Sequence, residues 1–154
     1  MATCCSGDKI YVCGGLHHED TVLKKCEVYN IQTNSWESIK SMNVKRKDSS
    51  CVLMNGEFVY VFGGSNPDEN SIDSVEKYSV KENNWEIVPV KLPCFMAKQV
   101  VLRVSSRTIL LLGGNIIGEE GFVRRSSKVY RLFTDTNFLQ EEIPLPKPTL
   151  SIYP

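Results

Sequence analysis

The feature that most constrains the fold is a pair of adjacent glycines that recurs at a nearly fixed interval. Diglycines occur at Gly14-Gly15, Gly63-Gly64 and Gly113-Gly114, and their first residues are separated by 49 and then 50 positions. A shift of 49 residues also superimposes Gly7 on Gly56, Tyr11 on Tyr60, Glu27 on Glu76, Tyr29 on Tyr78, Asn34 on Asn83 and Trp36 on Trp85. A period of this length is typical of a protein built from stacked repeats, in which each repeat packs on its neighbours.

The third repeat keeps the diglycine but departs from the pattern that follows it. Tyr130 lies 17 residues after Gly113, whereas Tyr29 and Tyr78 lie 15 residues after their own diglycines. Phe138 stands one position away from the place of the tryptophan. We interpret this segment as a degenerate third copy, with Tyr130 as the counterpart of the two earlier tyrosines.

Each repeat is predicted to consist of short strands separated by turns. Residues 10–13, 58–62 and 108–112 are continuous runs of β-favouring residues that stop at the diglycine, as expected for strands buried on both faces. Residues 51–54 precede Asn55-Gly56, a hairpin signal, and the polar residues 81–84 separate two further strands. Each repeat is therefore predicted to be a four-stranded antiparallel meander, and no segment shows helical periodicity.

The three segments "YVCGG…CEVYNIQTNSW", "YVFGG…VEKYSVKENNW" and "LLLGG…SKVYRLFTDTNF" give the chain its resemblance to the kelch family. That resemblance implies an all-β fold in which each repeat is one blade of a β-propeller. We expect one kelch-repeat domain over residues 1–154, with blades at about 1–42, 49–92 and 98–143 and with residues 144–154 entering a fourth blade. The motif residues are expected to be structural: Gly14, Gly15, Tyr29, Trp36, Gly63, Gly64, Tyr78, Trp85, Gly113, Gly114 and Tyr130.

Three blades form only part of a propeller, because closed rings typically have about four to eight blades. An open wedge would leave an apolar blade face exposed at each end. Three arrangements remove this problem: the chain is a fragment of a longer product, two copies form a homodimer that completes a six-bladed ring, or a partner protein caps the open faces. The sequence does not choose among them.

Composition excludes several classes of function. The 18 basic and 18 acidic residues balance, which argues against nucleic acid as a partner, and no apolar run approaches the length of a membrane helix. No basic, apolar leader is visible at the N-terminus, so we expect a cytoplasmic location, with a nuclear one left open. The six cysteines include no C-x-x-C pair and are expected to be reduced residues that pack as small apolar side chains.

The family resemblance implies that recognition residues lie in the loops after the diglycines and in the loops that join one blade to the next. These loops differ in length and charge while the strands keep their pattern, which suits a recognition surface on a constant scaffold. Arg46 stands where the family often carries arginine. The candidate binding residues are His17, His18, Lys45, Arg46, Asn66, Asp68, Glu69, Glu119, Arg124 and Arg125.

No catalytic or metal-binding motif stands out in the sequence. His17 and His18 lie near Cys13, but adjacent histidines on an extended chain point in opposite directions, so neither a metal site nor any other cofactor is expected. Phosphate-binding glycine loops, nucleophile elbows and zinc-protease motifs are absent from the sequence.

The leading hypothesis is a non-enzymatic module that binds a protein or peptide partner through its loops. The resemblance implies adaptor roles such as substrate recognition for a ubiquitin ligase, or binding to the cytoskeleton. The alternative is an enzyme resembling the sugar-active oxidase or isomerase members of the family, completed only by oligomerisation, with loop acids as acid and base groups. A truncated chain without function is the third hypothesis.

Overall fold

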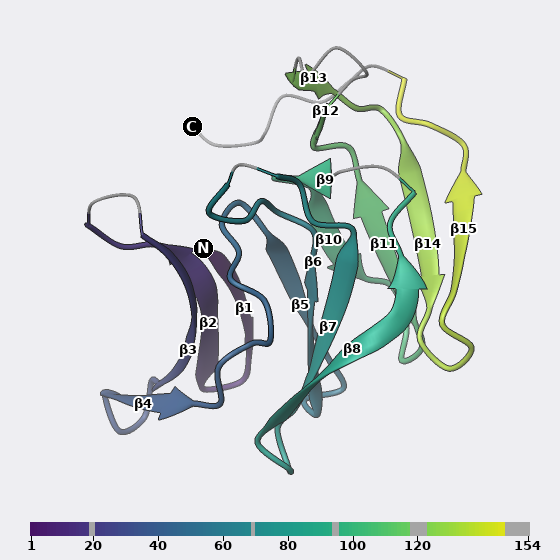
Figure 1. Ribbon diagram of the computed structural model, residues 1–154. Helices are drawn as coiled ribbons and strands as arrows, with labels where there is room; N and C mark the ends of the chain where they lie inside the picture. Colours follow the sequence, from purple (N-terminus) through teal and green to yellow (C-terminus); the bar gives the residue numbers. More distant parts are fainter. Residues whose placement is uncertain (19–20, 69, 94–95, 118–122, 147–154) are drawn as a thin grey trace.

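The computed structural model describes residues 1–18, 21–68, 70–93, 96–117 and 123–146, and the regular elements in these ranges are β-strands (Figure 1). Three four-stranded antiparallel sheets stand side by side in a row. The predicted all-β architecture is confirmed. None of the described ranges contains a helix long and apolar enough to cross a membrane.

Each four-stranded sheet is an antiparallel meander and corresponds to one predicted blade. The first blade contains β1 (Ala2–Ser6), β2 (Lys9–Leu16), β3 (Val22–Asn30) and β4 (Ser35–Ile39). The second contains β5 (Ser50–Met54), β6 (Phe58–Phe62), β7 (Ser74–Ser79) and β8 (Asn84–Lys91). The third contains β10 (Val100–Arg103), β11 (Thr108–Leu112), β14 (Val129–Phe133) and β15 (Phe138–Glu142).

A small fourth sheet, which the sequence pattern did not indicate, joins the second blade to the third. It consists of β9 (Met96–Ala97), β12 (Asn115–Ile117) and β13 (Val123–Arg125), in the order β13-β12-β9. Asn115, directly after the third diglycine, pairs with both Ala97 and Arg125. Ser65 does the same in the second blade, where it forms bridges to Lys47 and Ser71. The loops after the second and third diglycines are thus fastened to the segments that enter their blades.

The meander places two kinds of loop at the same end of the molecule. Because neighbouring strands are antiparallel, the loops after the diglycines and the segments that join the blades share one end, and the tight turns lie at the other. In Figure 1, β12 and β13 lie at the top with β9 below them, and the turns between β3 and β4 and between β7 and β8 lie at the bottom. We call the top of this view the upper end, and it holds the predicted recognition loops.

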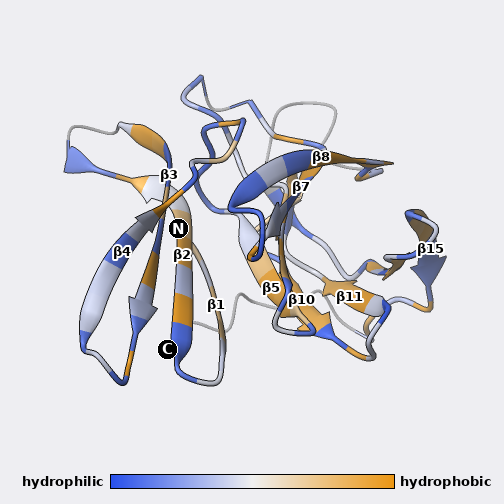
Figure 2. Ribbon diagram, turned by 90° about the horizontal axis from the view of Figure 1, so that it is seen from below, coloured by the Kyte–Doolittle hydropathy of each residue, from blue (hydrophilic) through white to orange (hydrophobic). Residues whose placement is uncertain are grey.

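The hydrophobic core lies between the blades. One buried cluster combines residues of the first two blades, among them Cys13, Val28 and Val61. A second cluster combines residues of the second and third blades, among them Phe62 and Leu111. Figure 2 shows the hydrophobic stretches along β5 and β11 between the sheets. A blade therefore buries its faces only against its neighbours, as expected for a repeat protein.

The third blade corrects one part of the predicted repeat. Tyr29 and Tyr78 pair with residues four positions before their diglycines, but Tyr130 pairs with Leu111, two positions before Gly113. Leu132 occupies the tyrosine position, and its partner Leu139, rather than Phe138, occupies the tryptophan position. The prediction of Tyr130 as the counterpart of the two tyrosines is therefore wrong, because the longer loop before β14 moves the tyrosine position to Leu132, two residues past Tyr130.

Buried thiols form part of the first core cluster. Cys13, Cys26 and Cys51 are buried free cysteines, which confirms the expected packing role for these three, while Cys4 is half-buried, Cys5 is exposed and Cys94 lies outside the described residues. A hydrogen bond with Cys26, together with burial, raises the pKa of Cys13 well above its usual value. A hydrogen bond with Cys4, together with burial, raises the pKa of Cys51 in the same way.

The thiols should therefore separate into two classes when the protein is alkylated at neutral pH. The thiolate is the reactive species, so Cys5 should react with iodoacetamide quickly, while Cys13 and Cys51 should react only when the protein unfolds. Peptide mapping by mass spectrometry at increasing urea concentration measures each rate. Equal rates for Cys5 and Cys13 in the native protein would contradict the burial.

The diglycines are required where the joining segment passes close to the end of β6. Gly63 has φ +57°, and a Cβ at this position would lie 2.2 Å from the carbonyl oxygen of Met96. Side chains are unfavourable at positive φ, and here the obstructing atom belongs to the backbone. Gly56 also has positive φ, at +74°, but a Cβ there would meet no atom within 4 Å.

Gly63→Ala and Gly56→Ala therefore form a matched pair of substitutions. Gly56→Ala should cost about 1–2 kcal/mol of unfolding free energy, which is the cost of the left-handed conformation alone. Gly63→Ala should cost at least about 2 kcal/mol more, because the backbone of the joining segment must also move. Urea unfolding followed by circular dichroism measures both, and equal losses would show that the close contact carries no penalty.

Candidate functional site

The segment between β4 and β5 connects the first two blades at the upper end through its backbone. The Arg46 amide donates to the Leu23 carbonyl at 3.0 Å, and the Arg46 carbonyl accepts from the Gly15 amide at 2.9 Å, both in the first blade. The next residue, Lys47, exchanges two hydrogen bonds of 2.9 Å with Ser65 of the second blade. Consecutive residues thus bind to different blades, which fixes the loops of the upper end relative to each other.

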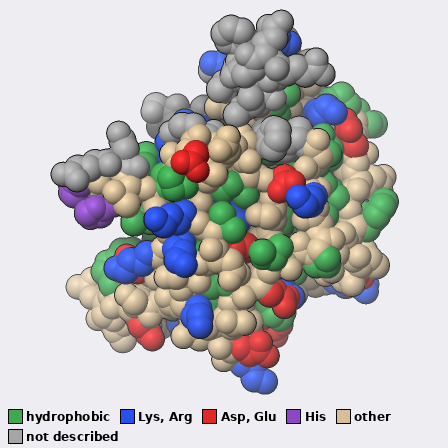
Figure 3. Space-filling model, in the orientation of Figure 1, with side chains coloured by type: hydrophobic (Ala, Val, Ile, Leu, Met, Phe, Trp, Pro, Cys, Tyr) green, Lys and Arg blue, Asp and Glu red, His purple; other side chains and the backbone are tan. Residues whose placement is uncertain are grey.

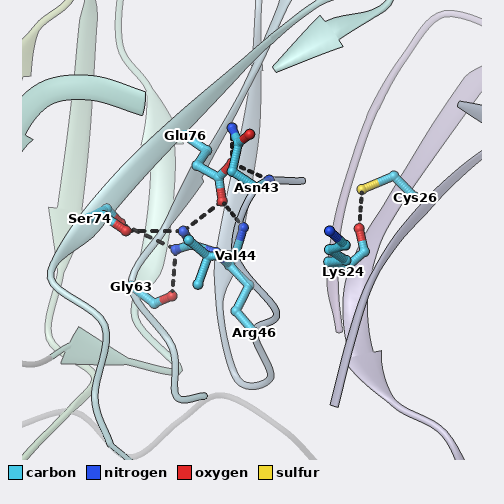
Figure 4. Close-up of polar contacts among 8 residues, drawn as sticks. All are labelled: Lys24, Cys26, Asn43, Val44, Arg46, Gly63, Ser74 and Glu76. Atoms are coloured by element: carbon cyan, nitrogen blue, oxygen red, sulfur yellow. Dashed lines mark hydrogen bonds and ion pairs between the residues drawn. The ribbon is translucent and has the colours of Figure 1, made fainter. Parts of the chain in front are cut away.

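The Arg46 side chain extends away from solvent into the second blade. One terminal nitrogen donates to the Gly63 carbonyl at 2.9 Å, and the other donates to Glu76 Oε1 at 2.8 Å and to Ser74 Oγ at 3.1 Å (Figure 4). Arg46 is 0% exposed. The prediction of Arg46 as a surface binding residue is therefore wrong, because acceptors at the ends of β6 and β7 draw its guanidinium into the interface.

Glu76 completes this buried network from the side of β7. Its Oε2 accepts hydrogen bonds from the Asn43 amide at 2.7 Å and from Asn43 Nδ2 at 2.9 Å, and Oε1 accepts from the Val44 amide at 3.2 Å. Burial lowers the pKa of Arg46, but the charge of Glu76 and its hydrogen bond oppose this shift. The carboxylate therefore holds both the arginine and the backbone that precedes it (Figure 4).

The next joining segment uses apolar side chains at the corresponding positions. The Met96 carbonyl accepts from the Gly64 amide at 2.9 Å, as the Arg46 carbonyl does from Gly15, so Met96 is the structural counterpart of Arg46. Tyr130 is the structural counterpart of Glu76, because each pairs with the residue two positions before its diglycine. Both Met96 and Tyr130 belong to the second apolar cluster. Lys98, the nearest basic residue in sequence, instead lies with its ammonium 3.8 Å from the Asp48 carboxylate.

The two histidines of the first loop are exposed and contact each other. The His17 and His18 rings lie 4.9 Å apart in an edge-on arrangement, so the expectation that they point apart is wrong. The chain is no longer extended here, since β2 ends at Leu16 and the His17 amide bonds to the Thr21 carbonyl at 2.9 Å. In Figure 3 they project at the left edge of the molecule. Within the described part of the chain, no three His, Cys, Asp or Glu side chains are arranged to hold a metal ion.

The remaining predicted residues divide into a loop-shaping group and an exposed group. Asn66 is half-buried, and its Oδ1 accepts from the amides of Asp68 at 3.0 Å and Asn70 at 2.9 Å, so its side chain shapes the second loop. The exposed residues are Lys45, Asp68, Arg124 and Arg125, while Glu69 and Glu119 lie outside the described residues. Figure 3 shows acidic and basic side chains interspersed on this view of the molecule.

Comparisons with known proteins place these features in a family. The kelch motif matches residues 1–43 and 45–89, which is more than half of the chain. A solved structure of YjhT superimposes with a TM-score of 0.76 at 16% sequence identity, covering 94% of this chain and 50% of that chain. The chain thus spans half the length of the YjhT structure, and this likeness concerns the fold alone. No curated protein matches the sequence.

The strand meanders, the diglycine contacts and the two motif matches define the class of protein as one built from β-propeller blades. This chain belongs to the kelch-repeat family.

The buried ion pair gives a testable stability difference. Arg46→Met should cost about 3–5 kcal/mol, because the Glu76 carboxylate then stays buried without a cation. The double variant Arg46→Met with Glu76→Gln should lose less than the sum of the two single variants, because no charge remains unpaired. Urea unfolding measures this coupling.

Lys25→Ala is the control for this comparison of single and double variants. Its ammonium lies 2.6 Å from Glu27 on the surface of the first blade, and its removal should cost less than about 1 kcal/mol. If Arg46→Met cost no more than Lys25→Ala, the buried network would have no part in joining the blades.

Proposed function

We propose that this kelch-repeat chain is a non-enzymatic protein–protein interaction module that binds a protein or peptide segment with its upper end. The observation that supports this most strongly is the contrast between fixed joining segments and varied loops. The joining segments bind to both blades through their backbone, while the three loops after the diglycines differ in length and charge. Such loops on a constant scaffold suit recognition.

The exposed residues at the upper end provide the contacts for this binding. His17, His18 and Lys45 lie near the first two blades, and Arg124 and Arg125 lie on β13 above the third. Arginine is among the side chains that most often carry binding energy at interfaces. A partner that spans the three blades would meet all of these residues at once.

An adaptor role is the more specific form of this proposal, either as the substrate-recognition part of a ubiquitin-ligase adaptor or as a cytoskeleton-binding protein. The alternative is a sugar-active enzyme whose site is completed only by oligomerisation. The carboxylates of Asp48 and Asp73 near the upper end face Lys98 and Lys91, respectively, in ion pairs. Charge pairing of this kind favours a binding surface over acid and base catalysis, which needs a carboxyl group positioned to exchange a proton with substrate.

Charge reversal tests this proposal directly. The triple variant Lys45→Glu, Arg124→Glu and Arg125→Glu should capture the specific partner roughly tenfold less well, as expected when binding-energy residues of an interface are reversed. Immobilised protein and quantitative mass spectrometry of the retained proteins measure the loss. Arg46 is left unchanged because its substitution would perturb the fold.

The tight turns at the opposite end of the molecule provide the matched control. Lys9→Glu, Lys81→Glu and Arg107→Glu change the charge by the same amount at exposed sites near the tight turns. This variant should retain the partner. Equal recovery by both triple variants would rule out recognition by the upper end, and turnover of a simple sugar by an assembled oligomer would favour the enzyme.

A further inference from the structure

Four of the six cysteines lie together at the interface between the first two blades. Cys13, Cys26 and Cys51 belong to the buried cluster that joins these blades, and the half-buried Cys4 packs against the same cluster. A single thiol in a core acts only as a small apolar side chain, whereas thiols that lie in pairs can form disulfides. The arrangement of the four thiols therefore decides whether this interface has redox chemistry.

The four thiols form two pairs. Cys13 and Cys26 are direct partners across β2 and β3, and they share a hydrogen bond. Cys4 of β1 and Cys51 of β5 also share a hydrogen bond, and this second pair joins different blades. β1 and β5 are the edge strands of separate sheets and stand next to each other (Figure 1). Thiols in hydrogen-bond contact point at each other, which is the first requirement for a disulfide.

The two pairs differ in their access to solvent. Cys13 and Cys26 are both 0% exposed, so an oxidant dissolved in water reaches neither sulfur in the folded chain. Cys4 is half-buried, and its partner Cys51 is 8% exposed. Thiol oxidation follows exposure and thiolate character, and a redox-sensitive cysteine is typically an accessible one beside a second, resolving thiol. The pair of Cys4 and Cys51 fits this description.

The hydrogen bond between Cys4 and Cys51 gives the two thiols different roles. Together with burial, it raises the pKa of Cys51 well above its usual value, so the Cys51 thiol keeps its proton at neutral pH. Because the thiolate is the species that attacks an oxidant, Cys51 is not the first of the two to react. Cys4 is the thiol that meets the oxidant, and Cys51 is the resolving thiol that supplies the second sulfur.

Cys5 provides a control within the same strand. It follows Cys4 on β1, and adjacent residues of a strand point to opposite faces of the sheet. Cys4 faces the cluster between the blades, whereas Cys5 is exposed. The face of β1 that carries Cys4 is therefore the one that meets Cys51, and the more accessible thiol next to it points away from this partner.

We propose that Cys4 and Cys51 form a reversible disulfide that links the first two blades when the protein meets hydrogen peroxide. In the first step, the Cys4 thiolate attacks one peroxide oxygen and the O–O bond breaks. Cys4 becomes a sulfenic acid, and the departing hydroxide takes up the proton that the thiol had released. In the second step, the Cys51 sulfur attacks the Cys4 sulfur, and the sulfenic hydroxyl leaves as water with the Cys51 proton.

The two steps balance, because each sulfur is oxidised by one electron while the peroxide is reduced to two molecules of water. A thiol reductant reverses the reaction by attack on Cys4, the accessible sulfur of the disulfide. The bond closes a loop from residue 4 to residue 51 and so restricts the unfolded chain. Oxidation therefore stabilises the packing of the first blade on the second, and this inference is independent of the binding proposed for the upper end.

Disulfide mapping of the natural chain tests the proposal. The reduced protein is treated with hydrogen peroxide, the remaining thiols are blocked with iodoacetamide, and tryptic peptides are sequenced by mass spectrometry. Trypsin cleaves after Lys9 and Lys47, so Cys4 and Cys51 fall in separate peptides. Their disulfide should be the main product and should disappear with dithiothreitol. Its formation should raise the unfolding midpoint by roughly 5–15 °C.

Three single variants assign the roles of the thiols. Cys51→Ala should lose the disulfide and accumulate the Cys4 sulfenic acid, which dimedone traps. Cys4→Ala should lose the disulfide and show no dimedone adduct on Cys51. Cys5→Ala is the matched control and should keep both the disulfide and the rise in the unfolding midpoint. The midpoint of each reduced variant measures any loss of packing separately, and disulfide mapping of the natural chain does not depend on the variants.

Several results would overturn the proposal. Cys4 and Cys51 could stay reduced in the peroxide-treated native chain, or the main disulfide could contain a different cysteine. A disulfide between Cys4 and Cys51 that leaves the unfolding midpoint unchanged would contradict the link between the blades. A covalent dimer through Cys4 on a non-reducing gel would show that this thiol reacts with a second copy instead of with Cys51.

Discussion

The relation between the first two blades depends on one buried ion pair. The Arg46 side chain extends from the segment that joins the blades and binds the Glu76 carboxylate of the second blade. Two backbone amides of the same segment also donate hydrogen bonds to this carboxylate. Buried charged groups are stable only when all their hydrogen-bond partners are present. The ion pair therefore fixes the position of the joining segment at the interface between the blades. The exposed loops at the upper end take their relative positions from that crossing.

The two interfaces of the chain show that one backbone arrangement accepts different side-chain chemistry. The carbonyls of Arg46 and Met96 make the same bond to a diglycine, yet one side chain enters a polar network and the other an apolar cluster. The face of the first blade that has no neighbour keeps the carboxylate, through Glu27. The type of interface therefore varies from blade to blade.

Much of the fold could be predicted from the sequence, because it depends on local signals. The continuous apolar runs, the hairpin turn at Asn55-Gly56 and the period of the diglycines indicate four strands per blade. The tyrosine and tryptophan pairs of the first two blades also followed from spacing. The third blade was misaligned because a longer loop moves the tyrosine position to Leu132, two residues past Tyr130, and the sequence offers no measure of how the extra residues are accommodated.

The sequence by itself determined the repeat, the strand order and the end of the molecule on which the variable loops lie, since all three follow from periods and turns within one blade. Only the tertiary structure decided which charges are surface charges. Lys45 and Arg46 are adjacent basic residues, yet the first is exposed and the second is buried. The difference arises from acceptors on a neighbouring blade, 17 and 30 residues away in sequence, which become neighbours only when the blades pack.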